Sequence, residues 1–149
     1  MGRRLTAADV CAVTGYSRDE LHALLRVLEP YCTDKPSPRV AREFTPRDLV
    51  VLGVTQVLED RYGLRRTAVA ELGLHLQSAL VGPKGVNRDA RLSISVRPPG
   101  VDYLDAGAIA TEGLIIALGP LFAKIDDYLS FEPQLSLQFG PSLITRKYG

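Results

Sequence analysis

The chain has 149 residues, of which 46% are hydrophobic and 23% are charged, and its formal net charge is +1 at pH 7. These proportions are typical of a globular chain that buries a core, and they exclude a strongly basic or strongly acidic protein. Two cysteines, Cys11 and Cys32, exclude a disulfide-rich scaffold.

No segment has the pattern expected of a membrane span or a secretory signal. The most apolar run, residues 113–123, is about half of the ~20 residues that cross a bilayer, and it contains Pro120. Arg3 and Arg4 are followed by a mixed sequence rather than by an apolar stretch. We therefore expect a soluble, cytoplasmic protein with no membrane partner.

Two short helices are predicted at the start of the chain. Thr6 is a typical N-cap, and Asp9 places a negative charge in the first turn. Gly15 is expected to end this helix because glycine tolerates positive φ. Ser17 begins a capping box, and leucines at helical spacing then predict a second helix that ends near residues 29–30.

A turn and two further helices are expected next. Prolines and polar residues predict a turn at residues 34–38, whose flanks could pair as short strands. Thr45, followed by Pro46 and Asp48, has the pattern of a helix start, and Gly63 is expected to end that helix. A fourth helix is predicted over residues 65–80.

The C-terminal part, residues 81–149, is predicted to be a small α+β region for dimerisation or regulation. It follows a Gly- and Pro-rich boundary, and residues 91–96, 101–104 and 134–139 have the pattern of strands. Residues 111–130 are predicted to be a helix.

An apolar stripe on that predicted helix admits two interpretations. Leu114, Leu118, Leu121, Ile125 and Tyr128 are spaced 4-3-4-3, which fits either a core or a seam between subunits. Two heptads are short for a coiled coil, and a proline within the helix should kink it. We expect a dimer interface that combines this helix with adjacent strands.

The order helix, glycine turn, helix, Pro-rich hairpin, helix, helix is that of a winged helix-turn-helix. The segments "LTAADVCAVTGYSRDEL" and "REFTPRDLVVLGVTQVLEDRYGLRRTAVAEL" resemble the DNA-binding domain of MerR-type transcriptional regulators over residues 5–74. The shared pattern is a capped first helix, a "TG-(apolar)-S" turn, an Arg-(x)-aromatic-Thr wing exit, a "DL" helix start and a glycine after the third helix. It is matched here at Thr6, residues 14–17, residues 42–45, residues 48–49 and Gly63.

The resemblance implies both a fold and a function. The expected fold is mainly α, with a winged helix-turn-helix domain over residues 1–80 followed by the α+β region. The expected function is a sequence-specific, repressor-like transcriptional regulator that binds double-stranded DNA as a homodimer on a pseudo-palindromic site.

The candidate DNA-binding residues lie on the second helix, in the expected wing and at the start of the fourth helix. Arg18, in the first turn of the second helix, is the best candidate for reading a base, because its guanidinium can grip guanine with two hydrogen bonds. Lys35, Arg39 and Arg42 in the expected wing could bind DNA phosphates or enter a minor groove, or they could be ordinary charged loop residues. The candidates are Ser17, Arg18, Asp19, His22, Arg26, Lys35, Arg39, Arg42 and Arg65.

The second helix departs from the family pattern in a way that leaves other functions open. MerR-type proteins commonly continue "Leu-Arg-Tyr-Tyr", whereas this chain has Leu21, His22, Ala23 and Leu24. A neutral histidine in place of arginine weakens the expected grip on phosphate. The alternatives are a protein-interaction adaptor whose helix-turn-helix does not read DNA, and an excisionase-like architectural DNA-binding protein.

Catalysis and metal binding are not expected. The segment "VGPKG" lacks the spacing of a phosphate-binding P-loop, and no nucleophile–base arrangement is evident. His22 and His75 lack ligand spacing, so neither a metal nor a cofactor is predicted. No cysteine follows Cys32, which excludes thiol-based metal sensing in the C-terminal part. A small-molecule effector or a partner protein stays open.

Overall fold

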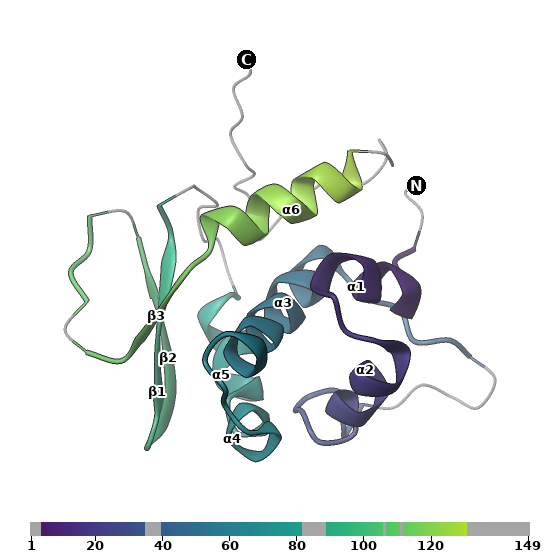
Figure 1. Ribbon diagram of the computed structural model, residues 1–149, viewed down its shortest axis with the longest axis horizontal. Coiled ribbons are helices and arrows are strands. Elements are labelled where there is room, and N and C mark those ends of the chain that lie inside the picture. Colours follow the sequence, from purple (N-terminus) through teal and green to yellow (C-terminus); the bar gives the residue numbers. More distant parts are fainter. Residues whose placement is uncertain (1–3, 35–39, 82–88, 106, 111, 131–149) are drawn as a thin grey trace.

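The computed structural model describes residues 4–34, 40–81, 89–105, 107–110 and 112–130. Within these ranges the chain forms six α-helices and one three-stranded antiparallel sheet (Figure 1). The fold is mixed α+β, and the prediction of a mainly α protein was wrong. Strands are predicted in the C-terminal part, but the sheet has a third strand where a helix is predicted, and it contributes to the core.

The first two helices form as the sequence predicts. Helix α1 (Ala7–Thr14) is capped by Thr6, whose backbone N–H donates to Asp9 Oδ2 at 2.7 Å. Gly15 ends it with φ +90°, a left-handed conformation that glycine adopts without strain. Helix α2 (Arg18–Leu25) begins with the predicted capping box, in which Glu20 N–H donates to Ser17 Oγ at 3.1 Å. The segment from Gly15 to Ser17 is therefore a tight turn between two capped helices.

The segment after α2 differs from the prediction. Helix α2 ends at Leu25, and turns continue from there to residue 34 instead of a helix to residues 29–30. The strands expected beside the turn at residues 34–38 are absent from residues 31–34 and 40–43, and residues 35–39 lie outside the described residues. Phe44 instead pairs with Leu5 in an isolated antiparallel bridge, and both side chains are buried.

Helix α3 (Pro46–Asp60) forms the centre of the helical part. Its start is confirmed: Asp48 N–H donates to Thr45 Oγ1 at 3.2 Å, and Pro46 occupies the first turn, where its missing N–H costs no hydrogen bond. The helix ends at Asp60, shortly before Gly63 with φ +68°.

The predicted fourth helix is two helices, α4 (Arg66–Ala70) and α5 (Gly73–Ala79). The interruption lies where Gly73 approaches the backbone of Glu29. A Cβ on Gly73 would lie 2.2 Å from the Glu29 carbonyl oxygen, so only glycine fits this contact. Leu72, between the two helices, and Leu76 of α5 are both fully buried.

The sheet consists of β1 (Arg91–Val96), β2 (Pro99–Leu104) and β3 (Leu114–Ala117), in the order β2-β1-β3. The strand at residues 91–96 is confirmed, and the second strand forms but begins two residues before the predicted position 101, with Leu92 opposite Tyr103 and Ile94 opposite Val101. The strand predicted at residues 134–139 lies outside the described residues. Leu92 and Ile94 are buried and alternate with more exposed serines, as a half-buried strand requires.

The prediction of one helix over residues 111–130 was wrong in its first half. Residues 114–117 form β3, which pairs with β1, and helix α6 (Gly119–Leu129) begins only afterwards. Adjacent β-branched residues, Ile115 and Ile116, suit a strand. Pro120 lies in the first turn of α6, where proline is tolerated, so the expected kink does not arise.

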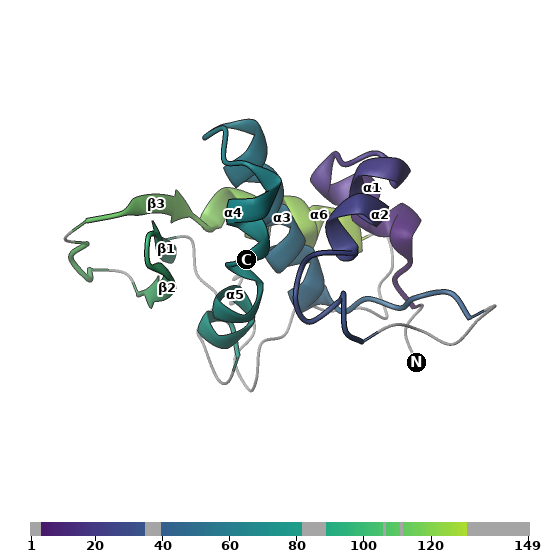
Figure 2. The same cartoon turned by 90° about the horizontal axis from the view of Figure 1, so that it is seen from below.

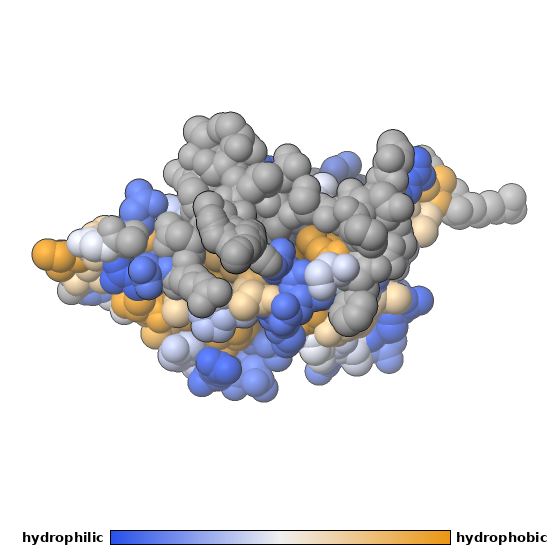
Figure 3. Space-filling model, turned by 90° about the horizontal axis from the view of Figure 1, so that it is seen from above, coloured by the Kyte–Doolittle hydropathy of each residue, from blue (hydrophilic) through white to orange (hydrophobic). Residues whose placement is uncertain are grey.

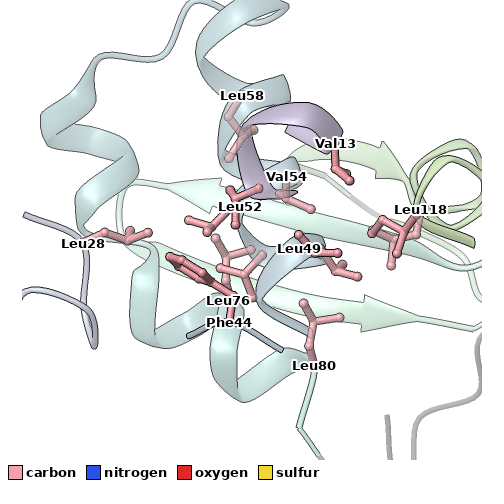
Figure 4. Close-up of a cluster of buried hydrophobic side chains, with 14 of the residues drawn as sticks. Val13, Leu28, Phe44, Leu49, Leu52, Val54, Leu58, Leu76, Leu80 and Leu118 are labelled. Carbon is pink, nitrogen blue, oxygen red and sulfur yellow. The ribbon is translucent and has the colours of Figure 1, made fainter. Parts of the chain in front are cut away.

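One hydrophobic core includes side chains from both parts of the chain. Figure 4 shows Val13 of α1, Leu49 and Val54 of α3, Leu80 after α5 and Leu118 before α6 pointing into the same region. Figures 1 and 2 show α6 lying along α1 and α3, with the sheet at one end of the molecule. The proposed division between residues 80 and 81 stays a prediction.

The described surface carries scattered apolar side chains. On the face drawn in Figure 3, hydrophobic and hydrophilic residues are interspersed, and a small hydrophobic group lies at the left tip. The most exposed large apolar residue in the described ranges is Ile109, between β2 and β3, at 86% exposure. Among the described helices, none has both the length and the apolar character needed to span a bilayer.

Candidate nucleic-acid interface

A pocket of about 820 Å³ lies between the start of α1, one side of α2 and the segment that leads into α3. Its floor is mostly apolar. Small or buried side chains from all three segments contribute to it: Ala7, Ala8, Leu25, Tyr31, Ala41 and Phe44. The Leu5–Phe44 bridge holds the third segment beside α1, and the lining residues Leu25, Tyr31 and Phe44 also belong to the hydrophobic core.

Three side chains from α2 and its C-cap, Arg26, border this pocket. Arg18, His22 and Arg26 recur every four residues, a spacing that places them on one side of the helix. All three are exposed, and within the described residues no hydrogen bond or ion pair engages their side chains. The α2 face, defined by these three residues, is therefore available to an anionic partner.

Arg42 borders the pocket from the opposite side but is differently engaged. Its guanidinium donates to the carbonyl oxygens of Asp34 at 3.0 Å and Tyr31 at 3.2 Å. It also lies 5.8 Å from the centre of the Tyr31 ring, a cation–π distance. These bonds join Arg42 to the turns at residues 31–34, where the sequence pattern predicts a strand.

Tyr31 is the centre of a buried polar cluster below Arg42. Its hydroxyl donates to Asp48 Oδ1 and accepts from Gln77 Nε2 at 3.1 Å, so it connects α3 with α5. Its ring lies 6.5 Å from that of Phe44. Burial, reinforced by the Asp48 carboxylate, raises the pKa of Tyr31 far above its usual value of about 10. The hydroxyl is thus held as a neutral donor.

A second polar cluster fixes the turn between α1 and α2. The Tyr16 hydroxyl lies 3.1 Å from Thr55 Oγ1 and donates to Glu59 Oε1 at 3.1 Å. Glu59 in turn accepts two hydrogen bonds from Arg66, at 2.6 and 3.1 Å. Burial also raises the pKa of Tyr16 above its usual range. The turn that sets the direction of α2 is therefore tied to α3 and α4.

The other candidates from the sequence are dispersed. Ser17 and Asp19 are exposed at the start of α2 but do not line the pocket, and the Ser17 hydroxyl caps the helix. Arg65 is exposed at the N-cap of α4 and does not line it either. Lys35 and Arg39 lie outside the described residues. The structure thus brings Arg18, His22, Arg26 and Arg42 to one pocket.

Sequence reasoning missed the two features that shape this site. Ala7, Ala8 and Ala41 leave the space for the pocket, but small residues give no periodic signal. The pattern around Tyr31 predicts a short strand, and its hydrogen-bond partner Gln77 lies 46 positions away. The capping pairs, whose members are three residues apart, can be predicted from the sequence. A hydrogen bond between residues 46 positions apart cannot.

The described residues offer no cluster of three or more histidine, cysteine or acidic side chains suited to a metal ion. Cys11 is partly buried on α1, and burial raises the pKa of its thiol. A raised pKa lowers the thiolate fraction at neutral pH, so this thiol is a poor nucleophile.

No protein-family model, no curated protein and no solved structure matched the chain.

Proposed function

We propose that this protein is a sequence-specific DNA-binding regulator that reads DNA with α2. The observation that carries the proposal is the α2 face, which leaves Arg18, His22 and Arg26 exposed on one side of a helix whose direction is fixed by a capped turn. A helix of this kind fits a major groove about 12 Å wide, with its N-terminal residues nearest the bases. The resemblance of residues 5–74 to MerR-type regulators supports the same assignment.

The residues of the α2 face take separate roles in this proposal. Arg18 is nearest the N-terminus of α2 and contacts a base edge. Arg26, two helical turns later, contacts a phosphate. Arg42 has a positioning role, because two of its five N–H donors bond the carbonyl groups of Tyr31 and Asp34 and hold the side chain in place. In this proposal α1 and α2 act as a helix-turn-helix, and no DNA contact is assigned to a wing.

We further propose that the protein binds DNA as a homodimer. A chain with net charge +1 and three residues on its α2 face gives few phosphate contacts, and each contact adds to a salt-dependent affinity. Two copies on a pseudo-palindromic site double these contacts, and linking them raises the affinity of the second through effective concentration. Sedimentation of the complex should then give two protein chains per DNA duplex.

DNA binding is tested by fluorescence anisotropy on fragments that flank the protein's own gene, at several salt concentrations. Arg18→Ala and Arg26→Ala should each weaken binding by about tenfold, and Arg26→Ala should lower the salt slope by about one. Arg97→Ala is the matched control, because Arg97 is also exposed but lies in the turn between β1 and β2. It should leave both quantities unchanged.

Two results contradict the proposal. The wild-type protein could have no affinity for any fragment even at low salt, which is the behaviour of a protein-interaction adaptor. Alternatively, Arg97→Ala could weaken binding as much as the α2 variants do, which would place the contact elsewhere. Binding that bends the duplex without changing transcription would favour the architectural role.

A further inference from the structure

The pocket beside α2 is lined largely by apolar side chains, which a contact with a DNA phosphate does not require. A phosphate needs donors and positive charge, and these are supplied by the α2 face. It gains nothing from Ala8, Ala41 and Phe44 on the pocket floor. An apolar floor bordered by cations instead suits a molecule that has both an apolar body and an anionic end.

The dimensions and charge of the pocket agree with a small ligand. Its volume of about 820 Å³ falls within the ~300–1,000 Å³ of typical ligand pockets, which are also mostly apolar with a few polar groups. The described lining residues include three arginines and one histidine, and no aspartate or glutamate. This charge complementarity selects an anion over a neutral or cationic molecule.

We propose that the pocket binds an amphipathic organic anion, an aryl or alkyl body that ends in a carboxylate or sulfonate. The apolar body lies on the floor between α1 and residues 41–44, and the anionic end meets Arg18 and Arg26. Because these arginines also serve the proposed DNA contact, the ligand and DNA exclude each other, a consequence that rests on the proposed function. The pocket is then the effector site of the regulator.

The ligand site is tested first without DNA, with a pair of fluorescent probes. 1-Anilinonaphthalene-8-sulfonate carries an aromatic body and a sulfonate, and N-phenyl-1-naphthylamine is its neutral counterpart. The wild-type protein should bind one equivalent of the sulfonate at least tenfold more tightly than the neutral probe. Equal affinities for the two probes would overturn the role of the cationic border.

Two alanines on α1 provide a matched pair of variants. Ala8 and Ala12 are both exposed, but only Ala8 lines the pocket. Ala8→Leu fills the space and should weaken sulfonate binding at least tenfold, while Ala12→Leu should leave it unchanged. Thermal unfolding checks that both variants are folded. Unchanged binding in Ala8→Leu, or equal loss in Ala12→Leu, would overturn the assignment of the probe to this pocket.

Competition with DNA separates this inference from the proposed function. Saturating sulfonate probe should weaken DNA binding by the wild-type protein at least tenfold and leave Ala8→Leu unaffected. If the wild-type protein binds no DNA but passes both probe tests, the ligand site stands and the proposed function fails. If DNA and the probe bind together without competition, the effector role is wrong while DNA binding stands.

Discussion

The two sides of the pocket carry similar side chains but use them differently. On one side, the α2 face presents Arg18, His22 and Arg26 to solvent. On the other, Arg42 and Tyr31 are bonded to carbonyl, carboxylate and amide groups. A positively charged residue in the sequence is therefore not necessarily free to bind a partner. The deciding factor is whether acceptors lie within hydrogen-bond reach, as they do for Arg42 in the Tyr31 cluster, which comprises Tyr31, Arg42, Asp48 and Gln77.

The two sides of the pocket therefore have different roles: the α2 face binds a partner, and the Tyr31 cluster stabilises the fold around it. An exposed arginine without partners contributes little to folding, because solvent screens its charge. A bonded arginine beside a buried tyrosine contributes mainly to folding. Substitutions on the two sides should thus affect different measurements.

The largest effect is expected where α5 supports the segment that leads to Tyr31. Gly73→Ala places a Cβ 2.2 Å from the Glu29 carbonyl oxygen, which the backbone must move to accommodate. We expect a loss of about 3 kcal/mol in the free energy of unfolding, measured with urea. Gly100→Ala is the control, because a Cβ there meets nothing within 4 Å and should change stability by less than about 0.5 kcal/mol. Equal effects would contradict the close approach of α5 to residue 29.

Removing the central hydroxyl of the Tyr31 cluster should have the next largest effect. Tyr31→Phe leaves Asp48 and Gln77 without their shared partner, and we expect a loss of about 2 kcal/mol. Tyr62→Phe, at a residue that is 46% exposed, should cost less than about 0.5 kcal/mol. A Tyr31 variant as stable as the wild type would show that the cluster does not support the fold.

Arginines from opposite sides of the pocket should affect stability and DNA binding differently. Arg42→Ala should lower the free energy of unfolding by about 1–2 kcal/mol, because it removes two hydrogen bonds to carbonyl groups. Arg26→Ala should change it by less than about 0.5 kcal/mol and reduce DNA affinity instead. The reverse assignment of effects would break the proposed division of roles.

The smallest effect is expected at alkaline pH. The pKa of Tyr31 is raised in the folded protein, so its stabilising contribution is complete below the unfolded pKa of about 10 and is lost as the pH rises above that value. Between pH ~9 and ~11 the wild-type protein should lose about 1 kcal/mol more than Tyr31→Phe does. Parallel losses in the two proteins would contradict the raised pKa.

Local features of the fold could be predicted from the sequence, and distant pairings could not. The caps at Thr6, Ser17 and Thr45 depend on residues three positions away, and all three formed. Residues 114–117 became a strand because Ile116 pairs with Leu92 and Leu114 with Ile94. Helical spacing within a short apolar run does not distinguish that outcome from a helix.

The candidate site also combines features that the sequence predicts with features that it does not. The α2 face follows from a four-residue spacing on a predicted helix. The engagement of Arg42 depends on turns at residues 31–34, and their geometry depends in turn on Asp48 and Gln77. The pocket floor depends on alanines that matter only because larger residues surround them.

The contact between Tyr128 and Asp9 has a consequence for the order in which the molecule is made. The Tyr128 hydroxyl donates to Asp9, the buried carboxylate that caps α1, across 119 positions of sequence. During synthesis the N-terminal helices emerge first, but this bond can form only after α6 has left the ribosome. Closing so long a loop slows folding more than it weakens the final structure. The first helix to be synthesised is therefore among the last to be completed.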